Sequence, residues 1–597
     1  MKLSKLYTNK PNVFEPIDFV HGLNVVVAEI RLHENLDKDT HNLGKTTLGR
    51  VLDYCFLAGT SKDHFLIKHG NLFSELVFYL EIELEDGTYA TIRRAIAESS
   101  KISFKSHEAS HQDFVSLPIS SWDHQDVSFQ KARVILDGIL DWRALKPWSY
   151  RKSLGYLLRS QEDYREVFKL RKFASKHADW KPFLAHLLGF DAALIDQHYK
   201  NEQILAEKEE IVNTIKKELG GSIEDISKVE GILLLKQKDA EKKQTILDDF
   251  DFRVPDKENL KQLVDNVDRD LSDANQERYS LNQNRRKIVA SLEDDQILFD
   301  PEEAERLFRE AGVLFSGQIK KDFEQLIGFN KAITDERRGY LQEELVDLKG
   351  ELKRVNAKAN RLGKKRSDML SFLSDTNVVS KYKIFSDELV VLKADISSLE
   401  RQREHLHRLQ ELRTEIRKLK EALGHLQIQI EENVESQNSD KDSLFSTIRV
   451  YFNEIVEEVV DRKALLSVSP NSKGHLEYKA ELLDQSGNST SADHGYSYRK
   501  LLCIAFDVAI LIAHIDVKFP FFVFHDGVFE SLDDRKKENL LQVIRKYADL
   551  GLQPIITMID SDMPPVDAKS QLFSDDEIIL TLHDEGAKGR LFKLNSW

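Results

Sequence analysis

The spacing of apolar residues changes twice along this chain of 597 residues. From about residue 192 to 437, leucine and isoleucine recur at intervals of three and four, as between Leu389 and Leu399, with Glu and Lys around them. This spacing is typical of a coiled-coil seam, in which the outer positions are charged. Residues 1–190 and 438–597 mix strand-like apolar runs with turns and helices. The pattern predicts two α/β segments separated by long helices.

The helical region is predicted to be an antiparallel hairpin, because its breaks are paired about its middle. We expect an ascending coiled coil at 191–297 with an elbow near 248–256, a helical tip at 298–332, and a descending coiled coil at 333–437 with an elbow near 371–379. The tip contains no Cys-x-x-Cys pair that could hold a metal. Several independent helical bundles are the alternative. A hairpin brings the two α/β segments together.

Composition adds limits to this picture. Charged residues make up 31%, with only 26 Gly and 12 Pro, which favours long solvated helices over many short strands. The net charge of -15 argues against indiscriminate coating of nucleic acid but leaves a local basic face possible. Cys55 and Cys503 form neither a zinc pattern nor a disulfide framework, and no apolar run approaches the ~20 residues that span a bilayer. We therefore expect a cytoplasmic protein without membrane contact.

A Gly-Lys-Thr sequence follows the apolar run 23–28 and precedes a helix-like stretch. In a phosphate-binding loop, backbone N–H groups hold phosphate oxygens, the lysine reaches the β- and γ-phosphates, and the threonine hydroxyl binds Mg²⁺. The full pattern has a glycine where this chain has Asp39, so an ordinary helix start is the alternative. The motif predicts nucleotide binding by Asn42, Leu43, Gly44, Lys45, Thr46 and Thr47.

The last segment carries elements that complement this loop. Residues 519–524 are predicted to form a buried strand that ends at Asp526, and an aspartate at such a strand end holds the Mg²⁺ shell. Asp533, after a short loop, is expected to contact the nucleotide across a dimer. A second core strand at 553–558 lies where a residue that senses the γ-phosphate is expected. For each element alone, plain core architecture is the alternative.

This order of parts resembles the structural-maintenance-of-chromosomes (SMC) superfamily of ABC ATPases over the whole chain. Some stretches are similar to one branch, the SMC-like ATPases of bacterial ABC three-component conflict systems, which include Lamassu-type defence subunits. These stretches are 41–47, 497–507, 524–527 and 589–593, with 319–324, Phe329 and 336–338 at the tip.

The resemblance implies an α/β ABC-type ATPase head assembled from the N- and C-terminal segments, with a long antiparallel coiled-coil hairpin inserted between them. It implies ATP and Mg²⁺ as cofactors, and a contact of Gln161 with Mg²⁺ and water. It also implies a homodimer through the ATPase heads that binds double-stranded DNA. The function implied is sensing or clamping of phage or plasmid DNA and control of an effector nuclease, with a small accessory subunit as a further partner.

Three departures from the superfamily bear on mechanism. Gly527 stands where the superfamily has a catalytic glutamate, so hydrolysis should be slow unless Glu530 or another residue substitutes, and a glutamate at position 527 should raise it. The switch histidine is missing. The signature motif is altered, and the donors to the γ-phosphate of the partner head are expected among Ser491, Gly495 and Ser497.

Two alternative functions follow from these departures and from the superfamily. One is a nucleotide-binding scaffold that does not hydrolyse ATP, and the other is a DNA-repair ATPase partnered with a nuclease. A basic run with interleaved aromatic residues favours DNA contact through phosphates, although a solvated helix face explains it equally well. Its basic residues are Arg165, Lys169, Arg171, Lys172, Lys176 and Lys181.

Overall fold

The computed structural model describes most of the chain. Its described residues are 1–597 without 34–42, 60–61, 63, 171–175, 220–224, 250–256, 294–316, 372–375, 485, 489–494, 565–571 and 595–597. Within helices, the side chains of 257–261, 291, 293, 317–337, 371 and 376–380 are also not described.

The chain divides into two compact units. The first unit combines Met1–Gln203 with Glu421–Trp597, and the second is Ile204–Lys420. The first unit is mixed α/β and the second is made of long helices. The expected meeting of the two ends of the chain is therefore confirmed.

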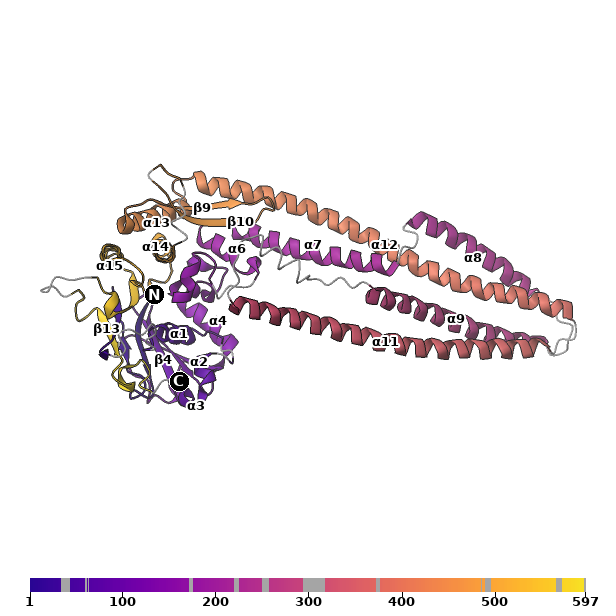
Figure 1. Ribbon diagram of the computed structural model, residues 1–597, viewed down its shortest axis with the longest axis horizontal. Coiled ribbons are helices and arrows are strands. Elements are labelled where there is room, and N and C mark those ends of the chain that lie inside the picture. The colour runs from indigo at the N-terminus through magenta and orange to yellow at the C-terminus, as the bar shows by residue number, and fades with distance from the viewer. Residues whose placement is uncertain are drawn as a thin grey trace. The chain divides into compact units, whose positions relative to one another are not determined.

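A parallel five-stranded sheet joins the two ends of the chain. Its strand order is β13-β3-β12-β11-β8, so strands from the beginning and the end of the chain are interleaved. Figure 1 shows the yellow strand β13 in the same part of the molecule as the indigo strands. The strands are β3 (Asn24–Glu29), β8 (Leu158–Arg159), β11 (Phe522–His525), β12 (Gln553–Ile559) and β13 (Ile578–His583).

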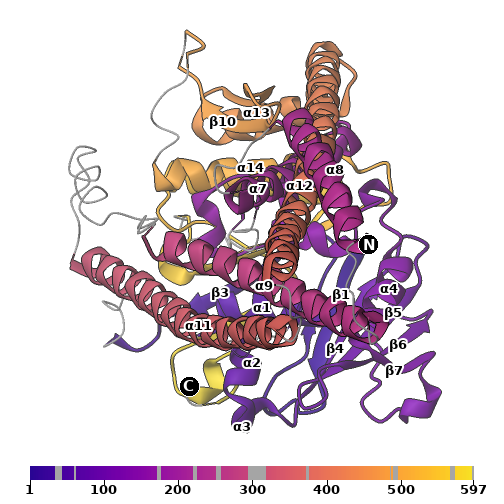
Figure 2. The same ribbon diagram turned by 90° about the vertical axis from the view of Figure 1, so that its right-hand side faces the viewer.

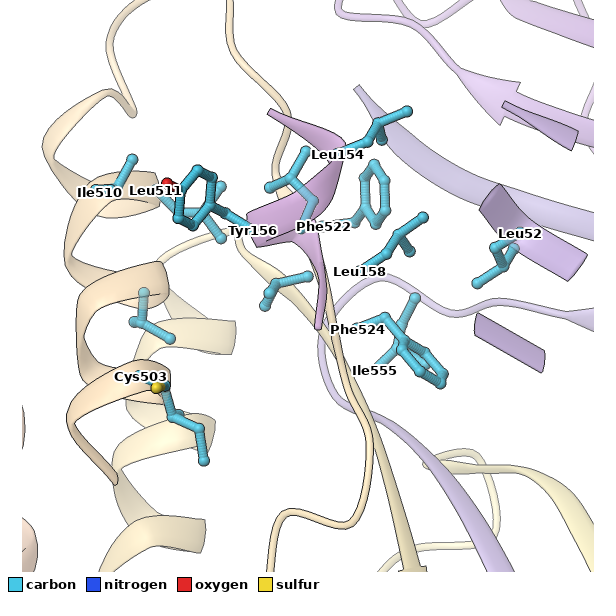
Figure 3. Packing of buried hydrophobic residues seen from close by; sticks show 14 of the residues in the cluster. Leu52, Leu154, Tyr156, Leu158, Cys503, Ile510, Leu511, Phe522, Phe524 and Ile555 are labelled. Carbon is cyan, nitrogen blue, oxygen red and sulfur yellow. The ribbon is translucent and has the colours of Figure 1, made fainter. Parts of the chain in front are cut away.

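Near-continuous Val, Ile and Phe runs form the inner strands of this sheet because both faces are covered. Figure 3 shows the packing between the sheet and the helices around it, with Leu158, Phe524 and Ile555 on the strands, Leu52 on one side and Ile510 on the other. All five side chains are buried. The parallel strands end at one edge, where loops from both ends of the chain meet.

Residues 1–128 also contribute an antiparallel six-stranded sheet, in the order β2-β1-β4-β5-β6-β7. Figure 2 shows β1, β4, β5, β6 and β7 as neighbouring strands. The bounds are β1 (Lys2–Thr8), β2 (Ile17–Asp18), β4 (Val77–Glu83), β5 (Tyr89–Ala95), β6 (Lys101–His107) and β7 (His124–Ser128). A separate hairpin pairs β9 (Ala464–Pro470) with β10 (Leu476–Leu482).

Helices of the first unit pack on these sheets. They are α1 (Lys45–Cys55), α2 (Phe65–Lys68), α3 (Gly70–Phe73), α4 (Phe129–Leu140), α5 (Leu154–Leu157), α6 (His177–Leu187), α13 (Leu444–Val460), α14 (Tyr496–Ala513) and α15 (Asp534–Asp549). The 3₁₀ helices are η2 (Ile119–Ser121), η3 (Arg143–Leu145), η4 (Tyr150–Lys152), η5 (Gln161–Arg165), η8 (Asp560–Asp562) and η9 (Ala587–Gly589).

The long helices are α7 (Ala192–Leu219), α8 (Ile226–Asp248), α9 (Lys257–Glu293), α11 (Gly317–Ser371) and α12 (Thr376–Ser439). In the second unit, α7 and α8 pair with α12 in antiparallel order, because Lys208 contacts Glu415 at 2.6 Å and Lys236 contacts Asp395 at 2.5 Å. A buried seam of Val, Ile and Leu residues lies between these helices.

The α9–α11 pair also contacts α12. The Arg366 guanidinium on α11 lies 2.7 Å from Asp268 on α9 and pairs with Asp387 on α12. Ser386 on α12 donates a hydrogen bond of 2.7 Å to Asp268, and Ser398 donates one of 2.6 Å to the Tyr279 hydroxyl on α9. The helices α9 and α11 therefore both lie alongside α12 in the second unit.

The helix ends refine the sequence expectations. The expected elbows lie between the end of α8 and the start of α9, and between α11 and α12, although most of their residues lie outside the described part of the chain. The descending helix α11 starts at Gly317, inside the expected tip. A further interruption separates α7 from α8, next to Gly220 and Gly221, and sequence reasoning missed it. Among the described helices, none has an apolar stretch long enough to cross a membrane.

Candidate functional site

The Gly-Lys-Thr segment lies at the N-terminus of α1, near the edge where the parallel strands end. Gly44 has φ 113°, a left-handed conformation that favours glycine, and a Cβ there would lie 2.5 Å from Cβ of Leu591. The Leu591 N–H donates a hydrogen bond of 3.0 Å to the Leu43 carbonyl, so the end of the chain braces this loop. No side chain caps α1, which leaves its first N–H groups for an anion. Asn42 lies outside the described residues.

Thr46 and Asp526 meet although they are far apart in the sequence. The Thr46 hydroxyl donates a hydrogen bond of 2.5 Å to Oδ2 of Asp526, which is fully buried just after β11. The Thr557 hydroxyl on β12 donates one of 2.7 Å to Oδ1 of the same carboxylate. The Gly527 N–H donates to the Thr557 hydroxyl at 2.9 Å. These bonds fix a hydroxyl and a carboxylate, both oxygen donors of the kind that Mg²⁺ takes, at the start of α1.

Lys45 points toward Glu530 without a hydrogen bond. Its Nζ is buried, has no hydrogen-bond partner among the described residues, and lies 3.6 Å from Oε1 of Glu530. The same Glu530 oxygen accepts a hydrogen bond of 2.6 Å from the Gln161 amide. Burial raises the pKa of Glu530, and the charges of Lys500 and Lys45 oppose this shift. The structure thus brings Lys45, Gln161 and Glu530 together.

Lys500 holds the turn that carries Glu530, and sequence reasoning missed it. Its buried Nζ donates hydrogen bonds to the carbonyls of Gly527 at 2.7 Å and Glu530 at 3.0 Å. Burial lowers the pKa of Lys500 to about 8. A lysine near the start of the mostly apolar helix α14 was the available signal, because a buried ammonium needs fixed acceptors.

The geometry at Gly527 opposes the expectation that a glutamate there would raise hydrolysis. Gly527 has φ +65°, and a Cβ at this position would lie 2.6 Å from the Gln161 amide nitrogen and 2.8 Å from the Glu530 carboxylate. A larger residue would displace both side chains from the site. That expectation is therefore replaced by the opposite one: a glutamate at position 527 should lower hydrolysis, because the positive φ favours glycine and the new side chain would push Gln161 and Glu530 aside.

The signature-like residues lie around a second helix start. Gly495 is the exposed N-cap residue of α14, and the Ser497 hydroxyl donates a hydrogen bond of 2.6 Å to the Ser531 carbonyl. Asp533 caps α15 by accepting a hydrogen bond of 3.1 Å from the Lys536 N–H. In the described part of the chain, neither Ser497 nor Asp533 forms a hydrogen bond with Lys45, Thr46 or Asp526. Ser491 lies outside the described residues.

The basic run is only partly a surface. Arg165, Lys169 and Lys176 are exposed. Lys181 is 8% exposed and donates a hydrogen bond of 2.6 Å to the Leu476 carbonyl, so its predicted contact with DNA is wrong. Lys181 belongs to a basic run in the sequence, but its ammonium forms a hydrogen bond within the fold. Arg171 and Lys172 lie outside the described residues.

A buried ion pair supports the strand that carries Asp526. The Arg159 guanidinium on β8 contacts both carboxylate oxygens of Asp507 on α14, at 2.6 and 2.7 Å, and His525 on β11 lies 3.1 Å from the same carboxylate. All three side chains are at most 2% exposed. The Asp526 N–H donates to the Arg159 carbonyl at 3.2 Å. No local sequence pattern indicates this pairing.

The residues present fit a nucleoside triphosphate with Mg²⁺. The buried Lys45 ammonium has only an ion pair of 3.6 Å with Glu530 in the described part of the chain, so it can bind a further anion, and an uncapped helix start offers N–H groups to the same anion. Thr46 and Asp526 supply oxygen ligands beside them. When bound, Mg²⁺ would neutralise phosphate charge at this place.

One family model matches the last part of the chain. A family model described as "Uncharacterised protein conserved in bacteria (DUF2326)" matches residues 452–596. No curated protein matches the chain.

Solved structures of SMC heads are similar over most of the chain. An Smc head domain with a coiled coil and joint from Pyrococcus yayanosii is 13% identical, with 94% of this chain and 92% of that chain covered and a TM-score of 0.36. An Smc head domain with an extended coiled coil from Pyrococcus furiosus, bound to the C-terminal domain of ScpA, is 11% identical, with 94% and 90% covered and a TM-score of 0.30. At these identities and TM-scores, the site is interpreted from the residues of this chain alone.

Proposed function

We propose that this protein is an SMC-like ATPase that binds Mg-ATP between the two ends of its chain and closes as a dimer on double-stranded DNA. The proposal rests mainly on the contact of the Thr46 hydroxyl with the Asp526 carboxylate. This contact lies beside the buried ammonium of Lys45, which forms no hydrogen bond with any described residue. Lys45 would pair with the β- and γ-phosphates, and Thr46 and Asp526 would hold Mg²⁺.

Glu530 is the proposed general base, with Gln161 as its positioning partner. In the absence of a carboxylate at position 527, Glu530 is the acidic side chain beside Lys45, 3.6 Å away. Burial raises the pKa of Glu530, which makes this carboxylate a stronger base than an exposed one. The hydrogen bond from Gln161 orients the carboxylate, and Lys500 fixes the turn that carries Glu530.

Pairing of two copies through their heads completes the proposed site. Gly495 and Asp533 are the N-cap residues of α14 and α15, and Ser497 lies in the first turn of α14. Among the described residues, none of the three forms a hydrogen bond with Lys45, Thr46 or Asp526 of its own chain. We assign these residues to the nucleotide of the partner copy. Hydrogen-bond donors at a helix start suit the γ-phosphate of a second nucleotide.

The finer proposal concerns DNA and defence. Exposed Arg165, Lys169 and Lys176 would contact DNA phosphates without reading sequence. In a defence complex, nucleotide-dependent closure on phage or plasmid DNA would control an effector nuclease bound with a small accessory subunit. A repair ATPase would use the same closure with a nuclease that processes breaks.

Substitution of Glu530 by glutamine tests the proposal. In Glu530→Gln, Mg-ATP should still bind, phosphate release should fall by roughly 10²–10⁴-fold, and the ATP-bound dimer should persist on a DNA duplex. Phosphate release, light scattering and DNA retention measure the three effects. The control is Glu538→Gln at an exposed position of α15.

Two results would contradict parts of this account. If the wild-type chain releases no more phosphate than Glu530→Gln, with or without DNA, the protein is a nucleotide-binding scaffold. If Mg-ATP leaves the chain monomeric in both variants, the assignment of Ser497 and Asp533 to a partner is wrong.

A further inference from the structure

Two histidines and a glutamate converge far from the Lys45 site. His198 and Glu202 are four residues apart on α7, so they lie on one face of the helix, one turn from each other. His475 lies in the turn between β9 and β10. One ligand atom from each of the three residues lies within 4.8 Å of the other two. All three residues belong to the first unit.

Only one of the two histidines forms a hydrogen bond with Glu202. Nε2 of His475 and Oε2 of Glu202 are 2.6 Å apart. Nδ1 of His198 lies 3.9 Å from the same carboxylate oxygen, too far for a hydrogen bond. His198 is 3% exposed, and within the described ranges its buried Nδ1 has no hydrogen-bond partner. A ligand bound between this imidazole nitrogen and the Glu202 carboxylate would satisfy both groups.

The β9–β10 turn is built to hold His475 against α7. Gly474 has φ +79°, and a Cβ there would lie 3.1 Å from Nε2 of His198. The Asn471 side-chain oxygen accepts hydrogen bonds from the Lys473 and His475 N–H groups. The His475 ring stacks on Tyr199, with ring centroids 4.8 Å apart. The turn therefore has little freedom to move His475 away from Glu202.

We propose that His198, Glu202 and His475 bind a divalent transition metal, with Zn²⁺ as the best match. Two imidazoles and one carboxylate form a set of ligands that zinc takes, and water would fill the fourth position. Such a metal would cross-link the start of α7 to the β9–β10 hairpin. This site is separate from the proposed Mg²⁺ position at Thr46 and does not depend on nucleotide binding.

Metal binding requires only small movements of the three side chains. In a tetrahedral zinc site with bonds of about 2.1 Å, neighbouring ligand atoms are about 3.4 Å apart. The Glu202–His475 separation must open from 2.6 Å, and the Glu202–His198 separation must close from 3.9 Å. Side-chain rotations are sufficient for both changes, because the ligands come from a helix and a fixed turn.

Zinc titration of the full-length chain tests the proposal. Calorimetry with Zn²⁺, and the visible absorption of Co²⁺ as a substitute, should show one site per chain in the wild type. His198→Phe and Glu202→Gln should each weaken Zn²⁺ binding by more than about tenfold, the least that even an outer-shell change costs in metal sites. Zn²⁺ should also raise the Tm of the wild type and not that of these variants.

Two further variants make the test decisive. His475→Gln changes a residue in a hairpin turn, so it should fold normally and still lose the site. His407→Asn removes an exposed histidine that lies 3.7 Å from Glu230 on the long helices, and it should keep full zinc affinity. Equal zinc affinity in the wild type and in His475→Gln would overturn the proposal, as would the absence of any bound Zn²⁺ or Co²⁺ in the wild type.

Discussion

Replacement of Lys45 by alanine is expected to weaken Mg-ATP binding by about 100-fold and to leave the nucleotide-free chain as stable as the wild type. In the proposed complex, the ammonium makes charge-assisted hydrogen bonds to phosphate, each worth about 1.5–3 kcal/mol. Without nucleotide, its Nζ forms no hydrogen bond and only a loose pair with Glu530 at 3.6 Å. Fluorescent-ATP titration and thermal unfolding, with and without Mg-ATP, measure both quantities.

The Tm without nucleotide and the increase in Tm caused by Mg-ATP together distinguish a role of Lys45 in nucleotide binding from a role in folding. The Tm of Lys45→Ala without nucleotide should match the wild type, while the increase in Tm caused by Mg-ATP should disappear. The control is Lys131→Ala, because Lys131 is exposed on α4. A variant that loses stability without nucleotide, or keeps its affinity for Mg-ATP, would show that Lys45 has a structural role.

Loss of the Asp507 carboxylate is expected to destabilise the first unit by about 3–5 kcal/mol. The Arg159 guanidinium would remain buried without a counter-charge, and a buried ion pair broken on one side costs about this much. Asp507→Asn preserves the shape of the side chain while removing its charge. Chemical denaturation measures the free energy of unfolding.

A double substitution separates loss of charge from loss of packing. Arg159→Met with Asp507→Leu removes both charges, so it should be more stable than Asp507→Asn. The rescue should be partial, because Arg159 also donates hydrogen bonds to the main-chain carbonyls of Asp163, Glu166 and Val167. If Asp507→Asn unfolds at the same denaturant concentration as the wild type, the guanidinium has another partner for its charge.

Local patterns predicted the elements of the head well. One signal is a buried apolar strand followed by Asp526, and the other is a Gly-Lys-Thr before a helix. Each of these signals is contained within a few consecutive residues. Heptad-like spacing predicted the long helices, because an antiparallel seam needs an apolar side chain every three or four residues. The expectation that Thr46 lies near Asp526, which the structure confirms, rests on the predicted hairpin, which would return the chain to its start.

Pairings between distant charged residues could not be predicted in this way. Asp507 lies within an apolar helix, and its partner Arg159 is 348 residues away, so neither residue has a local pattern that reveals the other. The group formed by His198, Glu202 and His475 has the same property. Lys181 was misinterpreted for a related reason: a lysine in a basic run can bury its ammonium on a carbonyl, and the sequence does not distinguish that from exposure.

The end of the chain shows a third kind of limit. Leu591 braces the Gly44 loop, and Phe592 packs among Phe14, Phe73 and Phe78. In the sequence, residues 589–593 show only a resemblance to other sequences, because no periodicity marks a segment whose side chains pack into the core. Packing of this kind depends on shape and becomes visible only in three dimensions.

The most direct test of the account is a crystal structure of the full-length chain with Mn²⁺ and a non-hydrolysable ATP analogue. The account predicts anomalous signal from Mn²⁺ between the Thr46 hydroxyl and the Asp526 carboxylate, whose oxygens should separate from 2.5 Å to about 3 Å to share an octahedral ion. It also predicts a phosphate oxygen within about 3 Å of Lys45 Nζ. Nucleotide and Mn²⁺ bound elsewhere, with Thr46 still hydrogen-bonded to Asp526, would contradict it.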